Sequence, residues 1–210
     1  MLDFIRIACA VPDVAVANVK HNAEEICKYI AQADEQNVDL LVFPELALTG
    51  ASCADLFFED ALHAAVRKGL HTIAECSWDH PEVTVVVGFP LRLGIQVFNC
   101  AAVFYDGCVA GITAKSNLTN EEKRWFTSGE RAAEKEIHAT GLGVDGIMGV
   151  GLEEYDIPMT EGAFAHAVGA EDGEEFSFAY GKADVMEHRT ITVGKAQVFD
   201  LNAHSDPPFR

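Results

Sequence analysis

The sequence predicts an α/β fold in which helices are layered on a mixed sheet. Two observations lead to this prediction. Segments with strand patterns alternate with segments of helical periodicity through the first half of the chain, and the dipeptide Asp106-Gly107, a strong hairpin signal, joins the last two predicted strands. The resulting order is strand, helix, strand, helix, strand and hairpin. This order favours a layered α/β fold over a barrel of hairpins.

The first predicted elements are a strand, a helix and a second strand. Residues 4–11 cluster apolar side chains as a strand buried on at least one face does. From residue 16 to about residue 36, apolar residues recur at steps of three and four, which predicts a helix with one apolar face. Residues 39–43 form a short continuous apolar run ended by Pro44, as expected for a strand that is covered on both sides.

A second helix and three further strands follow. Apolar residues between positions 56 and 73 have helical spacing, and residues 53–55 are available to start this helix. Residues 83–87 and 97–105 have strand patterns, and the hairpin turn leads from the second of them into residues 108–114.

The later part of the chain has a different composition. Residues 130–189 are rich in glycine, alanine and acids and show no sustained period, which predicts an irregular acidic insertion. Its glycine-rich run at 141–151 lacks the Lys-Ser/Thr of a phosphate loop, so we expect flexible backbone there. Residues 190–201 again indicate extended structure. We therefore divide the chain into 1–129, 130–189 and 190–210.

Net charge and hydropathy argue against nucleic acids and membranes as partners. The 210 residues carry 33 acids and 15 bases, a formal net charge of −18, which disfavours nucleic acids and anionic membrane surfaces. The sequence has no run of eighteen apolar residues, and its start lacks the pattern of a signal peptide. We therefore expect no membrane partner and a cytoplasmic location.

The cysteines and histidines suggest neither disulfides nor a metal site. Six cysteines are dilute at this length, and several lie inside apolar patterns where a reduced thiol packs as a small hydrophobe. The sequence has no CxxC pair, and His63, His71 and His80 are too scattered to form a ligand set. We expect these histidines to be surface or half-buried polar residues, and we expect no bound metal.

Two charged residues are candidates for a site because each follows a predicted strand. Glu45 comes directly after the apolar run at 39–43, and Lys115 comes directly after the strand at 108–114. Open α/β sheets bind ligands at the carboxyl ends of their strands, where a carboxylate can act as general base and an ammonium can stabilise an oxyanion. Taken singly, each also fits a plainer role, a glutamate capping a strand or a solvated lysine.

A block of sequence around Glu45 resembles the nitrilase superfamily. The segments FPELALTG at 43–50 and CADLFF at 53–58 are similar to its first motif as it stands in the glutaminase domain of NAD synthetases. Further segments follow in the order of that family: VGFPL at 87–91, FNCAA at 98–102, Lys115 with its neighbours, and KRWF at 123–126.

This resemblance implies an αββα sandwich with a Glu-Lys-Cys triad that hydrolyses glutamine and passes ammonia to an ATP-dependent synthetase domain. It implies that Glu45 is the general base and Lys115 the lysine beside the oxyanion. Either Glu121 or Glu122 takes the place of a second supporting glutamate near the substrate. By the same resemblance the domain needs no cofactor, ATP and Mg belong to a downstream synthetase domain, and the protein is a homo-oligomer.

The resemblance also predicts that the nucleophile is missing. In that family it lies in a later segment like Glu-Ile-Cys-Glu-Asp, whereas no cysteine follows Cys108 here. We therefore expect an incomplete sandwich that ends before the nucleophile, and no glutamine hydrolysis by the isolated chain. Two alternatives remain open: another amidase of the superfamily, such as an omega-amidase or a carbamoyl-hydrolysing enzyme, and a degenerate fragment without catalysis.

Overall fold

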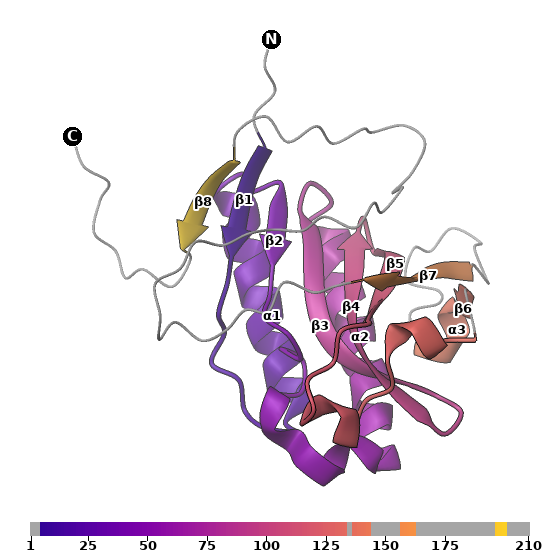
Figure 1. Cartoon of the computed structure of the whole chain (residues 1–210). Helices are drawn as coiled ribbons and strands as arrows, with labels where there is room; N and C mark the ends of the chain where they lie inside the picture. The colour runs from indigo at the N-terminus through magenta and orange to yellow at the C-terminus, as the bar shows by residue number, and fades with distance from the viewer. Residues whose placement is uncertain (1–4, 134–135, 144–155, 163–195, 201–210) are drawn as a thin grey trace.

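The computed structural model describes residues 5–133, 136–143, 156–162 and 196–200. Within these ranges the chain forms one mixed sheet of eight strands in the order β6-β7-β5-β4-β3-β2-β1-β8. Two long helices, α1 and α2, lie on one face of the sheet (Figure 1). The predicted α/β fold with a mixed sheet is confirmed.

The central strands set the directions that matter for the site. The strand bounds are β1 Ile5–Cys9, β2 Leu40–Val42, β3 Thr84–Leu93, β4 Gln96–Tyr105, β5 Cys108–Lys115, β6 Glu136–His138, β7 Asp156–Gly162 and β8 Ala196–Asp200. Strands β1, β2 and β3 are mutually parallel, and β4 is antiparallel to both β3 and β5. Strands β2, β3 and β5 therefore run in one direction, and their carboxyl ends meet at the same edge of the sheet.

Helix α1 (Val19–Glu35) follows the apolar periodicity that predicted it. The Asn18 side chain caps it by accepting a bond from the His21 backbone nitrogen, which satisfies one of the amides that an α-helix leaves unpaired at its start. The buried face is Val19, Asn22, Ala23, Ile26, Ile30 and Ala33. Burial of one stripe against the sheet and α2 is what stabilises a helix of this length.

The second helix begins later than its apolar residues suggested. Residues Ala51–Phe58 form the 3₁₀ segment η1, and α2 spans Asp60–Asp79. Ala54 has a φ of 50°, in the left-handed region, so the backbone bends there and cannot continue as one helix. The prediction of a single helix starting near residues 53–55 was therefore wrong.

The core lies between the helices and one face of the sheet. One row of side chains crosses five strands in register and is at most 1% exposed: Ala8, Leu41, Val85, Phe104 and Val109. Burial of a side chain such as Leu41 or Phe104 contributes roughly 1.5–3 kcal/mol. The next row along the same strands faces the other way and is only half-buried: Cys9, Val42, Val86, Val103 and Gly111.

Two further expectations differ from the structure. Strand β3 extends to Leu93 and turns through Gly94 into β4, so the two strands form a longer hairpin than residues 83–87 indicated. Within the predicted irregular stretch 130–189, the structure places β6, the short helix α3 (Ala139–Leu142) and β7. Strand β7 pairs with β5, so part of this stretch belongs to the sheet. The glycine-rich residues 144–151 lie outside the described ranges.

Candidate active site

Glu45 and Lys115 meet at the shared edge of the sheet. Glu45 lies three residues beyond β2, and Lys115 is the last residue of β5. The Lys115 Nζ atom lies 2.9 Å from Glu45 Oε1 and 3.2 Å from Glu45 Oε2. The side chain of Lys115 is only 4% exposed and that of Glu45 is 20% exposed, so this ion pair is largely removed from water.

A tight turn after β2 holds the backbone of Glu45 against β3. The Phe43 backbone nitrogen donates to the Val86 carbonyl at 2.9 Å, and the Leu48 nitrogen donates to the Gly88 carbonyl at 3.1 Å. Between these two anchors, Leu46 has a φ of 55°, a conformation that residues other than glycine rarely adopt. Such backbone strain is often found where a side chain must be presented to a site.

Asn99 on β4 is a third member of the site. Its side chain is buried, with 1% of the residue exposed, and its Nδ2 atom donates a hydrogen bond to Glu45 Oε1. Asn99 and Lys115 therefore converge on one carboxylate oxygen and restrict how Glu45 can rotate. Asn99 was not among the site residues predicted from the sequence. The signal was an amide side chain inside an otherwise apolar strand, a position where a buried polar group needs a partner.

Glu122 is a second carboxylate in contact with Lys115. Its Oε1 atom accepts a hydrogen bond from Lys115 Nζ at 2.6 Å, and its Oε2 atom accepts one from the Thr119 backbone nitrogen at 2.7 Å. The Glu122 backbone nitrogen in turn donates to Thr119 Oγ1 at 3.2 Å. This reciprocal arrangement resembles a capping box and holds Glu122 at the start of the 3₁₀ segment η2 (Glu122–Arg124).

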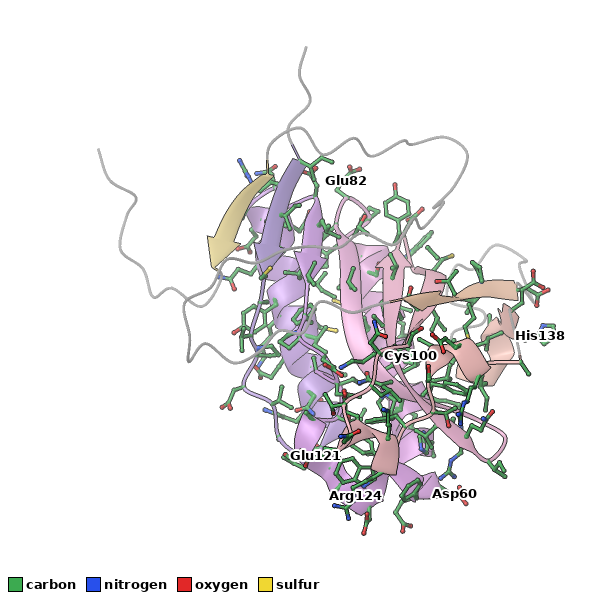
Figure 2. All side chains as sticks on the ribbon, viewed as in Figure 1. Asp60, Glu82, Cys100, Glu121, Arg124 and His138 are labelled. Atoms are coloured by element: carbon green, nitrogen blue, oxygen red, sulfur yellow. The ribbon has the colours of Figure 1, made fainter. Side chains whose placement is uncertain are left out.

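Aromatic packing attaches η2 to η1 beside the charged cluster. Phe57 of η1 is fully buried, and its ring lies 4.8 Å from Phe126 and 6.4 Å from Trp125. The Trp125 Nε1 atom also donates to Asp55 Oδ1 at 3.1 Å. Figure 2 shows this end of the molecule, where Glu121 and Arg124 are labelled. The contacts fix the segment that carries Glu122.

The cluster favours charged forms for its lysine and its second glutamate. Burial by itself lowers the pKa of Lys115, but the hydrogen bonds to Glu122 and Glu45 outweigh it, so the pKa is raised. Burial raises the pKa of Glu122, yet the hydrogen bonds from Lys115 and Thr119 lower it to about 2. At neutral pH Lys115 is therefore an ammonium and Glu122 is a carboxylate.

Replacing Glu122 with glutamine should change how stability depends on pH. The folded-state pKa of about 2 lies below the ordinary value of 4.5, so this group contributes stability above pH 4.5 that is lost as the pH falls through about 2. We expect Glu122→Gln to cost about 2 kcal/mol at pH 7 and progressively less toward pH 2. Urea denaturation at pH 7, 5 and 3 measures this difference.

Glu121→Gln is the matched control, because Glu121 is the exposed neighbour. It should leave the stability curve almost unchanged. If the difference in unfolding free energy between Glu122→Gln and the unchanged protein were the same at every pH, the pairing of Glu122 with Lys115 would be refuted.

Glu121 is not a member of this cluster, and neither Cys53 nor Cys100 is suited to supply its nucleophile. Lys115 contacts Glu122 and not Glu121, whose backbone carbonyl accepts the Arg124 nitrogen. Cys100 is 1% exposed in the middle of the sheet, and burial raises the pKa of its thiol (Figure 2). Cys53 donates to the Thr49 carbonyl at 3.1 Å, and burial raises its pKa too. Neither thiol is suited to act as a thiolate nucleophile.

The prediction for His63 needs correction. His63 is buried at 5% exposure and donates from Nε2 to the Phe57 carbonyl at 2.8 Å, so it supports η1 from inside and is not a surface or half-buried residue. Burial lowers its pKa.

Among the described residues, no group of three His, Cys, Asp or Glu side chains is placed to hold a metal ion. None of the helices in the described ranges is long and apolar enough to cross a membrane.

The sequence matches the family model for carbon–nitrogen hydrolases over residues 6–168. A glutamine-dependent NAD(+) synthetase of Xylella fastidiosa is 37% identical over 131 residues, which is 60% of this chain and 24% of that protein. The chain thus spans about a quarter of the length of this curated relative.

Two solved structures are similar to this chain. The crystal structure of a glutamine-dependent NAD(+) synthetase from Cytophaga hutchinsonii matches with a TM-score of 0.59 and 26% identity, covering 75% of this chain and 25% of that one. An amidase from Nesterenkonia sp. matches with a TM-score of 0.54 and 21% identity, covering 63% of this chain and 49% of that one. At that identity the amidase shows a shared fold alone.

Proposed function

The chain belongs to the carbon–nitrogen hydrolase family, and from this premise we propose that it carries the base and the lysine of a glutaminase site that supplies ammonia for NAD synthesis. The observation that carries the proposal is the buried Lys115 ammonium, held between Glu45 and Glu122 at the edge of the sheet. The names of the similar synthetases support glutamine as the substrate and a synthetase domain as the partner.

The proposed chemistry assigns one role to each charged group. Glu45 removes the proton of an attacking thiol and later donates it to the departing ammonia. Lys115 stabilises the oxyanion that forms when the thiol adds to the carboxamide carbon. Glu122 keeps the ammonium in place, and Asn99 keeps the Glu45 carboxylate in place.

The contacts of the cluster constrain the nucleophile. Lys115 Nζ lies 2.9 Å from Glu45 Oε1, so a thiol that attacks beside the ammonium also lies within reach of the Glu45 carboxyl group. In the proposed reaction this thiol loses its proton to Glu45 inside the site. Burial raises the pKa of the Cys53 and Cys100 thiols, so the proposal requires a thiol other than these two.

We also propose a cytoplasmic location for the enzyme, because free thiols stay reduced in the cytoplasm. We assign ATP and Mg to the synthetase domain and no cofactor to this domain. Oligomerisation remains a prediction.

A chimaera tests the proposal directly. The matched segment of the Xylella fastidiosa synthetase is replaced by the matching segment of this chain, and NAD formation is measured with glutamine or with free ammonia as nitrogen source. We expect glutamine-supported synthesis that falls about a thousand-fold in Glu45→Gln and in Lys115→Met. Synthesis from free ammonia should be unchanged in both variants, because it bypasses the glutaminase site.

Two results would contradict the proposal. Glutamine-supported synthesis that survives in Glu45→Gln would remove this residue from the chemistry. A chimaera that releases ammonia from glutamine, yet makes NAD only from added ammonia, would favour the amidase alternative. The unmodified 210-residue chain serves as the further arm, in which we expect no release of ammonia.

A further inference from the structure

Two cysteines face each other across the pair of helices that covers the sheet. Cys27 lies on α1 and Cys76 lies on α2, and both are free and half-buried. The Cys76 Sγ atom lies 3.7 Å from the carbonyl oxygen of Cys27. The Cys27 Sγ atom lies 3.8 Å from the carbonyl oxygen of Thr72, one turn before Cys76. Each sulfur is therefore directed at the backbone of the opposite helix.

The packing of the two helices permits a covalent link at this position. Near the start of α1 the Val19 side chain packs so close to Gly69 that an added Cβ atom would lie 2.7 Å from it. Near the end of α1 the His80 side chain lies 2.8 Å from Asp34 Oδ2. Cys27 and Cys76 lie between these two contacts, where the helices are held together on both sides. Packed helices have axes about 8–10 Å apart, which brings facing Cα atoms to within roughly 4–6 Å, the separation that a disulfide spans.

We propose that Cys27 and Cys76 form an oxidation site in which a peroxide converts the two thiols into a disulfide that links α1 to α2. The site is separate from the charged cluster at the edge of the sheet and does not depend on the proposed glutaminase activity. In the reduced state both cysteines are half-buried thiols within the helix pair.

The two thiols are not equivalent. A hydrogen bond from the Cys27 thiol lowers the pKa of Cys76 and outweighs the opposing effects of burial and of Asp79. The same hydrogen bond, together with burial, raises the pKa of Cys27. Cys76 is therefore the sulfur that reacts first, because the thiolate is the nucleophilic form.

The oxidation balances in two steps. The Cys76 thiolate attacks one peroxide oxygen, the O–O bond breaks, and Cys76 becomes a sulfenic acid while hydroxide leaves and takes up a proton to form water. The Cys27 sulfur then attacks the sulfenic sulfur, the S–O bond breaks, and a second water leaves with the Cys27 proton. Two thiols are oxidised, and one hydrogen peroxide is reduced to two waters.

The test uses the 210-residue chain. Reduced protein is treated with hydrogen peroxide, quenched, unfolded, alkylated with N-ethylmaleimide and digested for mass spectrometry. We expect one linked peptide pair joining Cys27 and Cys76, about 2 Da lighter than the two reduced peptides. The buried Cys53 and Cys100 should be alkylated in full. The thermal midpoint of the linked form should lie roughly 5–10 °C above that of the reduced form.

Variants that lack one cysteine test the proposal even if little disulfide-linked protein accumulates. In Cys27→Ala the sulfenic acid at Cys76 has no partner, and dimedone should trap it. In Cys76→Ala no adduct should form at Cys27. Cys108→Ala, which changes another half-buried cysteine, should leave the link intact. Full alkylation of Cys27 and Cys76 after peroxide treatment, a link to a different cysteine, or equal trapping in the first two variants would each overturn the proposal.

Discussion

Replacing Lys115 with methionine is expected to destabilise the folded chain by about 3 kcal/mol at pH 7. Methionine has similar length but no charge, so Glu45 and Glu122 would lose the ammonium that both contact. Their side chains are 20% and 17% exposed, which lets water compensate only part of the loss. Urea denaturation followed by circular dichroism measures the change in unfolding free energy.

Lys28→Met is the matched control for this prediction. Lys28 also pairs with a glutamate, Glu25 at 2.5 Å, but its side chain is 71% exposed. Exposed pairs of this kind contribute little to stability, so Lys28→Met should lower the unfolding free energy far less than Lys115→Met. The loss in Lys115→Met should also shrink below pH 4 as acid neutralises the carboxylates. An equal loss in both variants, or a loss that is constant down to pH 2, would show that the cluster is not a buried ion pair.

Replacing Gly88 with alanine should cost about 3 kcal/mol and disturb the site at the same time. A Cβ atom at this position would lie 2.4 Å from the Leu46 nitrogen and 2.7 Å from the Pro44 carbonyl oxygen. Both neighbours are backbone atoms and cannot rotate away, so the segment that carries Glu45 must move. Urea denaturation of Gly88→Ala, Lys115→Met and the double variant measures the stability loss and its coupling to the ion pair.

The coupling distinguishes displacement of Glu45 from general destabilisation. If Gly88→Ala moves Glu45 away, Lys115→Met should cost less in that background than alone. Gly111→Ala is the control, because a Cβ there makes only ordinary contacts at 3.7 Å and beyond. It should change stability by less than about 1 kcal/mol. Strict additivity of Gly88→Ala and Lys115→Met would show that Gly88 does not position the ion pair.

Periodicity and strand direction were enough to predict much of this architecture. The apolar steps of α1 correspond to a stripe that is now buried, from Val19 to Ala33. Glu45 and Lys115 were expected at strand ends, and the parallel course of β2, β3 and β5 brings those ends to one edge. These features depend on local pattern and on one topological rule, so a sequence suffices to predict them.

Other features depend on tertiary contacts that leave little local pattern. The left-handed Ala54 breaks a run that has helical spacing, and the packing of Phe57 against Phe126 then stabilises the 3₁₀ path. Strand β7 alternates exposed and buried residues from position 156 to 160, but this run is too short to stand out from the glycine-rich and acidic sequence around it. Its pairing with β5 is a tertiary contact that the local pattern does not indicate. The choice between Glu121 and Glu122 depends on which side chain the Thr119 contacts direct at Lys115.

The order of strands in the sheet has a consequence for biosynthesis. Strands β1 to β5 are consecutive in sequence and occupy the middle of the sheet, while the later β7 and β8 add to its two outer sides (Figure 1). The side chains that meet around Lys115 all precede residue 123. As the polypeptide leaves the ribosome from its amino end, the central strands and this charged cluster can assemble before the flanking strands emerge.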